Sequence, residues 1–351
     1  MFRLRFLLLA LLILTLSSVS APLAAAECGG TNLIPQLPAE DRATLDARAK
    51  ATPYHTGLFW RATKGDTDLS IFGTFHFHHD QTERQLTALM PHAHAADTTW
   101  FEMSYNDLIR FEKQSKSDPS LMFITSGPTI PEMMEEADWQ RLRTRMAALG
   151  IPSFMAAKFK PIFLAMMLGS SPCHMRAQMH GSKGIDEQLS RILHGENRPT
   201  RSIEDPATTM QLLDDFTRDE QIAMVKLSLD LPQDPDDLQA TLVTLYQQEK
   251  IALLWEYGRL LSLKYGGPSA GTDFEQFEQA LLTGRNLEWA KTVEAEMTGT
   301  RALIAVGAGH LPGEYGLLNL LAQQGFTIER RELYGPPHPD GPPAVERLPK
   351  R

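Results

Sequence analysis

The apolar positions along the chain predict six strands, most of them near its two ends. Each expected strand is a short run rich in β-branched and aromatic residues, bounded by glycine, proline or polar residues. The runs are Gly57–Thr63, Leu69–Thr74, Thr98–Met103, Thr200–Ile203, Leu303–Val306 and Phe326–Arg330. Between the first two lies Lys64-Gly65-Asp66, a sequence typical of a hairpin turn.

Apolar residues at intervals of three and four predict helices over most of the remaining chain. The segment 170–183 is instead expected to be a loop held by Cys173, and Pro161 is expected to kink or restart its helix. The expected helices are Ala39–Ala51, Gln81–Ala95, Asn106–Lys116, Pro131–Leu149, Ala156–Leu168, Gly184–His194, Ala207–Leu229, Asp236–Leu263, Phe274–Leu282, Asn286–Met297 and Pro312–Gln324.

Two of the expected strands end in the same way. Gly73-Thr74-Phe75-His76 and Gly307-Ala308-Gly309-His310 each place a histidine three residues after a glycine that closes an apolar run. Ligand crevices of open α/β sheets form at the carboxyl ends of strands. A single Gly-x-x-His carries little information, but two of them on neighbouring strands would aim His76 and His310 into one crevice.

This order of elements predicts an α/β (α+β) fold. Its central mixed sheet would carry the two Gly-x-x-His turns, and a large helical insertion at about 106–298 would form a lid or a groove wall. Residues 27–334 are expected to form a single domain, and the proline-rich segment 335–351 is expected to be disordered.

Glu102 and Arg285 are candidates for the same crevice. Glu102 ends an apolar strand, where a buried carboxylate needs a partner. It would be a metal ligand or a proton acceptor beside His76, or else a helix cap or an ion pair at the sheet rim. Arg285, between two expected helices, would bind an anion or oxyanion, or be a surface charge.

Other polar residues near the two turns have two readings each. His78 and His79 could ligate a metal or be solvated loop residues, and His76 is favoured over both. Asp80 could orient an imidazole or begin the next helix. Asp186 and Glu187 could complement a helix N-terminus, or one of them could reach the site.

The first 26 residues predict an exported protein. Arg3 and Arg5, an apolar centre over Phe6–Leu16 and the small residues Ala24–Ala26 have the order of a secretory signal peptide. An uncleaved anchor is the alternative, but the apolar centre is shorter than the roughly 20 residues of a spanning helix. We therefore expect a periplasmic or secreted location, with no transmembrane segment after signal cleavage.

The charge of the chain bears on its partners. The formal net charge is −9, and loss of the two arginines of the signal would move it to −11. An acidic surface of this size argues against nucleic acid as a partner. A peptide or a small molecule is the expected substrate.

The two cysteines, Cys28 and Cys173, are candidates for a disulfide. An oxidising compartment favours the bond. Two unpaired thiols remain the alternative, because the sequence does not give the distance between them.

Together these motifs resemble the TraB/GumN family, in particular its exported bacterial branch. The resemblance rests on Gly73–His76, Glu102, Gly184-Ile185-Asp186, Arg285-Asn286 and Gly307–His310 with Gly313, in this order, and covers about Cys28–Arg330. The family is similar to the Tiki metalloproteases, whose two Gly-x-x-His motifs and a glutamate are implicated in metal-dependent peptide cleavage. A more distant likeness is to erythromycin-esterase-type folds, in which histidine acts without metal.

The resemblance implies His76, Glu102 and His310 as the site, with Arg285 nearby. The leading expectation is a metal-dependent hydrolase, most readily a peptidase of the cell envelope. These three side chains would ligate a divalent ion, and Arg285 would stabilise the anionic intermediate. Two imidazoles and a carboxylate suit zinc, manganese or cobalt.

Three alternatives stay open from the sequence. The first is a metal-free esterase-like hydrolase that uses the same histidines and glutamate. The second is a non-catalytic binding protein that captures a peptide or saccharide. The third is a structural role in the envelope or in polysaccharide export.

Overall fold

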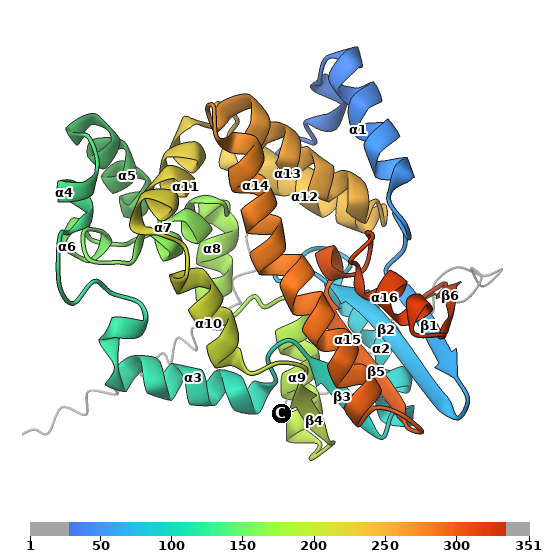
Figure 1. The fold of residues 1–351 in the computed structure, drawn as a ribbon. Helices are drawn as coiled ribbons and strands as arrows, with labels where there is room; N and C mark the ends of the chain where they lie inside the picture. Colours follow the sequence, from blue (N-terminus) through green and yellow to red (C-terminus); the bar gives the residue numbers. More distant parts are fainter. Residues whose placement is uncertain (1–27, 335–351) are drawn as a thin grey trace, which may run out of the picture.

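All six expected strands form and pair into one sheet in the computed structural model, which describes residues 28–334. The strands are β1 (Phe59–Lys64), β2 (Thr67–Thr74), β3 (Thr98–Phe101), β4 (Thr200–Ser202), β5 (Arg301–Gly307) and β6 (Thr327–Arg331). Their order across the sheet is β4-β3-β5-β2-β1-β6 (Figure 1). Strand β1 runs antiparallel to β2 and β6, whereas β4, β3, β5 and β2 are parallel. The expected mixed α/β sheet is therefore confirmed.

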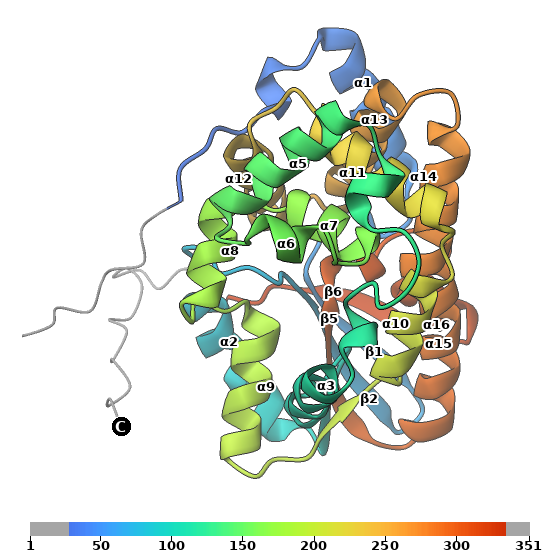
Figure 2. The same cartoon turned by 90° about the vertical axis from the view of Figure 1, so that its left-hand side faces the viewer.

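Helices cover both faces of this sheet. One face packs on α15 (Gly284–Glu296) and α16 (Leu317–Gln323), and the other on α2 (Thr82–Ala95) and α9 (Ile185–Gly195). Figure 2 shows the strands between these two helix pairs. Because the central strands are buried on both sides, residues 302–306 of β5 read as a continuous apolar run.

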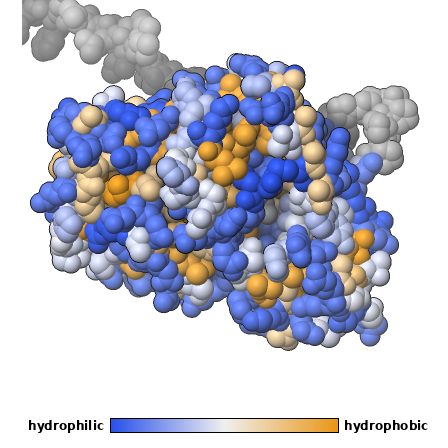
Figure 3. All heavy atoms as spheres, turned by 45° about the horizontal axis from the view of Figure 1, so that its top comes forward, coloured by the Kyte–Doolittle hydropathy of each residue, from blue (hydrophilic) through white to orange (hydrophobic). Residues whose placement is uncertain are grey.

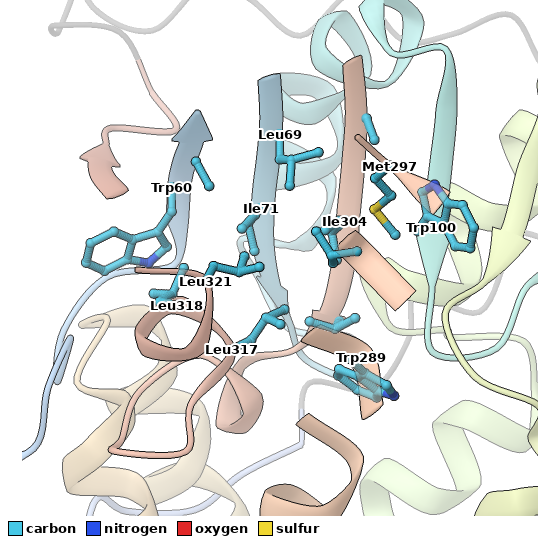
Figure 4. Close-up of a cluster of buried hydrophobic side chains, with 14 of the residues drawn as sticks. Trp60, Leu69, Ile71, Trp100, Trp289, Met297, Ile304, Leu317, Leu318 and Leu321 are labelled. Carbon is cyan, nitrogen blue, oxygen red and sulfur yellow. The ribbon is translucent and has the colours of Figure 1, made fainter. Parts of the chain in front are cut away.

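The largest core cluster lies between the sheet and the α15–α16 layer. Trp289 of α15, Leu317 of α16 and Ile71 and Ile304 of the sheet are each fully buried in it. Figure 4 shows how these side chains point toward one another from the strands and from the helices. This packing fixes the position of α15, which carries Arg285.

Apart from β4, the chain from residue 105 to 278 is a mostly helical part beside the sheet (Figure 1). Besides α9, which packs on the sheet, the helices of this segment are α3 (Tyr105–Ser117), α4 (Ile130–Met133), α5 (Glu136–Ala148), α6 (Ser153–Ala156), α7 (Pro161–Leu168), α8 (Pro172–Met179), α10 (Pro206–Asp214), α11 (Arg218–Asp230), α12 (Pro235–Gln247), α13 (Ile251–Tyr265) and α14 (Ala270–Glu278). The helix α1 (Ala39–Ala51) packs on α13.

The expected restart at Pro161 is confirmed, because Pro161 is the first residue of α7 and Ala156 ends the separate helix α6. Three other long helices expected from the sequence are each two helices. The segment 131–149 divides into α4 and α5, 207–229 into α10 and α11, and 236–263 into α12 and α13. Two of these breaks have local causes: Thr217 and Glu220 form a capping box at the start of α11, and Glu249 takes a left-handed φ of 58° before α13. Apolar periodicity continues across such breaks and therefore hides them.

The opposite error occurs at Arg285. The expected helices at 274–282 and 286–297 are joined, because α14 continues through a π-helical turn, η3 (Gln279–Thr283), directly into α15. Such turns occur mostly as single insertions in α-helices, often at functional sites. Here the turn lies directly before Gly284 and Arg285.

The segment expected to be a loop around Cys173 is also helical. Ser171 caps α8 by accepting from the backbone N–H groups of Cys173 and His174. Cys173 forms a disulfide with Cys28, with the two Cα atoms 5.6 Å apart. The expected pairing is confirmed, and it ties the start of the described chain to α8.

The Met-rich run 163–168 is divided between the interior and the surface. Leu164 and Leu168 of α7 are buried, whereas Met166 is 53% exposed. Two expectations, the signal peptide at 1–26 and the disordered tail at 335–351, lie outside the described residues. Within residues 28–334, no helix has both the length and the apolar character needed to cross a bilayer.

Candidate active site

The parallel pairing of β2 with β5 brings the two Gly-x-x-His turns to one edge of the sheet. In this register Gly73 lies opposite Val306 and Thr74 opposite Gly307. Strand β3 lies on the other side of β5, so that Glu102, the residue after Phe101, reaches the same edge. His76, Glu102 and His310 are therefore brought together, as the sequence predicts.

The three side chains converge on Gly307. A Cβ atom at this position would lie 2.8 Å from Oε1 of Glu102, 3.5 Å from Nε2 of His76 and 3.6 Å from Cδ2 of His310. The backbone there has φ −50°, which any residue adopts, so the space and not the conformation requires glycine. The Gly307 N–H also donates to Oε1 of Glu102 at 2.6 Å.

His76 is oriented by Asp186 at the start of α9. Its Nδ1 lies 2.8 Å from Oδ2 of Asp186, which leaves Nε2 directed toward Glu102. The charge of Asp186 raises the pKa of His76 to about 9. The His76 side chain keeps 57% of its surface exposed, so the imidazole ring can be reached from solvent. Of the two readings of Asp186, the one in which it reaches the site is confirmed.

His310 is buried and held in one tautomer. Burial lowers its pKa to about 3, so its ring is neutral at pH 7. Its Nδ1 lies 2.7 Å from Oδ1 of Asn286, an oxygen that only accepts, so Nδ1 carries the proton. Its Nε2 then accepts from Nη1 of Arg285 at 3.2 Å. The ring also stacks on Trp289 with centroids 4.2 Å apart.

Glu102 is held as a carboxylate. Its burial opposes ionisation, but the charge that His310 gains at low pH, the charges of Arg285 and His76, and the Gly307 N–H lower its pKa to about 2. Oε2 accepts from Arg285 at 2.6 Å. Its other oxygen, Oε1, faces the space at Gly307.

Arg285 connects the groups of the site and is not a surface charge. It is buried, and it donates to Glu102, Glu204, His310 and the carbonyl of Leu281. These contacts engage Nε, Nη1 and Nη2. In this arrangement Arg285 therefore orients Glu102 and His310, and its N–H groups are directed at the protein.

Glu204 belongs to this network although no sequence motif singled it out. Its carboxylate accepts from Arg285 at 2.5 Å and from the indole N–H of Trp289 at 2.8 Å. A signal was present, because Glu204 follows the apolar end of a strand region in the same way as Glu102. Asn286, quoted only as part of a motif, supplies the amide that fixes His310.

His79 and Asp80, which follow the His76 turn in the sequence, contact Gln247 of α12. His79 is buried, and burial lowers its pKa to about 4. Asp80 accepts from Gln247. The turn itself is braced by Tyr246 of α12, whose hydroxyl donates to the carbonyl of Gly73 at 2.9 Å.

Two imidazoles and a carboxylate around Gly307 are residue types that ligate metal ions, but they are not arranged as in a metal site. Among residues 28–334 no group of three or more His, Cys, Asp or Glu side chains is placed to hold an ion. The guanidinium of Arg285 already donates to Nε2 of His310 and Oε2 of Glu102, so neither atom is free to ligate an ion in this arrangement. Only Nε2 of His76 and Oε1 of Glu102 face the space at Gly307 together, so the three expected ligands do not fit an ion as they are arranged.

Comparison with known proteins identifies the family but not the activity. The sequence has no significant match among curated proteins. A family model, described as the TraB/PrgY/gumN family, matches residues 58–330, which include both histidine turns, Glu102, Glu204 and Arg285. Because this match covers most of the chain, the protein belongs to the TraB/PrgY/gumN family.

Proposed function

We propose that this protein is a hydrolase that cleaves a peptide bond, or a related carbonyl bond, at the crevice beside Gly307. The observation that carries the proposal is the convergence of His76, Glu102 and His310 on a residue without a side chain. Strongly shifted pKa values of these three groups support it, because such shifts concentrate at functional sites.

The arrangement favours His76 as the general base. Its neutral Nε2 would take a proton from a water held against Oε1 of Glu102 while the water oxygen attacks the carbonyl carbon. Asp186 would stabilise the imidazolium that forms, and the same proton would pass to the leaving group when the tetrahedral intermediate collapses. Glu102 stays ionised and Arg285 keeps it in place.

Metal-dependent hydrolysis is the second candidate. The approach of a carboxylate oxygen of Glu102 and Nε2 of His76 to the same glycine, Gly307, is the observation that favours it. His76, Glu102 and His310 would hold zinc, manganese or cobalt only after Arg285 has turned away from His310.

We further propose that the protein acts in the cell envelope or outside the cell. The Cys28–Cys173 disulfide supports this location, because such bonds persist in oxidising compartments.

The experiment that tests the function is a peptide and ester panel, assayed with the purified protein after chelation and after metal is restored. Activity that survives the chelator and is lost in His76→Ala supports the metal-free hydrolase. Activity that needs the restored ion supports the second candidate. A protein that binds the peptides unchanged under both conditions would overturn hydrolysis and favour a binding role.

A further inference from the structure

A hollow lies in the helical part, separate from the residues around Gly307. It has a volume of about 310 Å³ and is bordered by α7, α11, the end of α13 and α14. Apolar patches interrupt the polar surface of the helical part in the view of Figure 3. None of the residues that line this hollow belongs to the network around Arg285.

Small residues open the hollow and large apolar residues form its walls. Ala165 and Gly169 of the α7 region and Ala223 of α11 leave the space, whereas Ile162, Phe216 and Phe274 supply buried walls. Protein interiors are otherwise close-packed, so a hollow bounded in this way is suited to an apolar guest.

The polar groups at the hollow are mostly engaged by neighbours along the chain. The hydroxyl of Ser228 donates to the carbonyl of Met224, Glu220 accepts from Thr217, and Asp273 accepts from Ser269. A bound water needs two to four polar partners, which these walls supply poorly. Contact with an alkyl chain is the favoured interaction.

Size and charge narrow the class of guest. The volume is at the lower end of the range of small-molecule sites, about 300–1,000 Å³, and a peptide helix about 10–12 Å wide would not enter it. The charged side chains among the lining residues are Glu220 and Asp273, both acidic. These two carboxylates favour a positively charged head group on the guest and disfavour a carboxylate.

We infer that this hollow binds the alkyl chain of an amphiphile with a cationic head. Met166 and Met224 line the hollow, and their flexible thioethers adapt to chains of different shape. The inference stands independently of the hydrolase proposal, because it uses no residue of that site.

The test is calorimetric titration of the full chain with decyltrimethylammonium and, separately, with decanoate, both below micelle formation. We expect one decyltrimethylammonium per chain and at least tenfold weaker binding of decanoate. Equal binding of both probes, or uptake of several equivalents per chain, would overturn the inference.

Filling variants locate the site. Gly169→Leu and Ala165→Phe should each weaken decyltrimethylammonium binding at least tenfold, because the added side chains enter the hollow. The backbone at Gly169 has φ −69°, and a Cβ there would meet nothing closer than 3.5 Å, so a side chain is tolerated. Gly195→Leu at the exposed end of α9 is the control and should bind as the unaltered chain does. Unchanged binding in both filled variants would refute the site.

Photolabelling makes the test independent of variant stability. A decylammonium compound with a diazirine on its chain should label peptides from α7, α11 or α14 in the unaltered protein. Labelling confined to other peptides would refute the inference.

Discussion

At the scale of single residues, the carboxylates of the site have different tasks. Asp186 bonds Nδ1 of His76, the ring nitrogen that does not face Glu102. Glu102 places Oε1 beside Gly307, and Glu204 accepts a hydrogen bond from Arg285. Arg285 bonds two of them at once, so the orientation of Glu102 depends on Glu204 through the guanidinium. Single substitutions of Asp186 and of Glu204 therefore test their roles separately.

The pH dependence of hydrolysis should report the pairing of His76 with Asp186. A general base must be deprotonated, and the pKa of His76 is raised to about 9. Below that value kcat/KM should fall about tenfold for each pH unit. Asp186→Asn removes the charge that raises the pKa, so the acidic limb of the profile should move to lower pH and the rate at high pH should drop. The pH profiles of kcat/KM measure both effects.

Glu187→Gln is the matched control for this profile. Glu187 is on the same helical turn but pairs with Lys183 and Arg191 at the surface. In Glu187→Gln the acidic limb of the kcat/KM profile should lie at the same pH as in the unaltered protein. If the acidic limb of Asp186→Asn also lies at that pH, the assignment of His76 as the base is contradicted.

Glu204→Gln should destabilise the fold by about 3 kcal/mol, because it removes the charge from one partner of a buried ion pair. Urea denaturation gives the free energy of unfolding. Glu296→Gln is the control, since Glu296 pairs with Arg201 at the surface and exposed pairs contribute less than about 1 kcal/mol. Equal decreases in the free energy of unfolding in the two variants would show that the buried Arg285–Glu204 pair stabilises the fold no more than an exposed pair does.

At the scale of elements, the site is assembled from the ends of strands and from helices that come to them. Strands β2, β3 and β5 deliver His76, Glu102 and His310, and α9 and α15 deliver Asp186 and Arg285. The approach of α9 is close, since a Cβ at Gly184 would lie 2.4 Å from the carbonyl carbon of His76. This contact joins the start of α9 to the histidine turn.

Gly184→Ala should therefore displace the His76 turn. We expect a loss of stability of about 1–3 kcal/mol, the usual cost of overpacking, together with loss of the His76–Asp186 geometry. Denaturation and the pH profile above measure the two effects. Gly195→Ala, at the other end of the same helix with nothing within 4 Å, should be neutral or slightly stabilising. If Gly184→Ala behaves like Gly195→Ala, the close approach does not position His76.

At the scale of the whole molecule, the helical part and the sheet are connected through the site. Helix α12 braces the first histidine turn through Tyr246, and α8 lies against the same turn, where the His174 and Phe77 rings are 6.3 Å apart. The Cys28–Cys173 disulfide anchors α8. The helical part therefore supports the first histidine turn.

Removal of the disulfide should lower the free energy of unfolding by about 2–5 kcal/mol, the usual range for a native bridge. The bridge closes a long loop, with 145 residues of sequence separation, which places the loss toward the upper end in the chain-entropy account. Denaturation with and without reductant measures the effect. The Cys28→Ser, Cys173→Ser double variant should match the reduced protein and ignore reductant, and a bridge that leaves stability unchanged would contradict the prediction.

The sequence alone determined the strands, the two histidine turns and the acid that follows β3, because strand patterns and turn chemistry are local properties. It also placed Arg285 near the site through a resemblance. Helix boundaries were less determinable, since apolar periodicity runs across the breaks before α11 and α13 and a separation was predicted where η3 joins α14 to α15.

Only the tertiary structure decided which partner each polar group has. Three contacts join segments that are remote in the sequence, and no local pattern encodes such contacts. Asp186 bonds His76 across 110 positions, Glu204 and Glu102 share Arg285, and Cys28 is bonded to Cys173. The same holds for the metal ligands: the residue types suit an ion, but the position of the Arg285 guanidinium is set by the packing of α15 on the sheet.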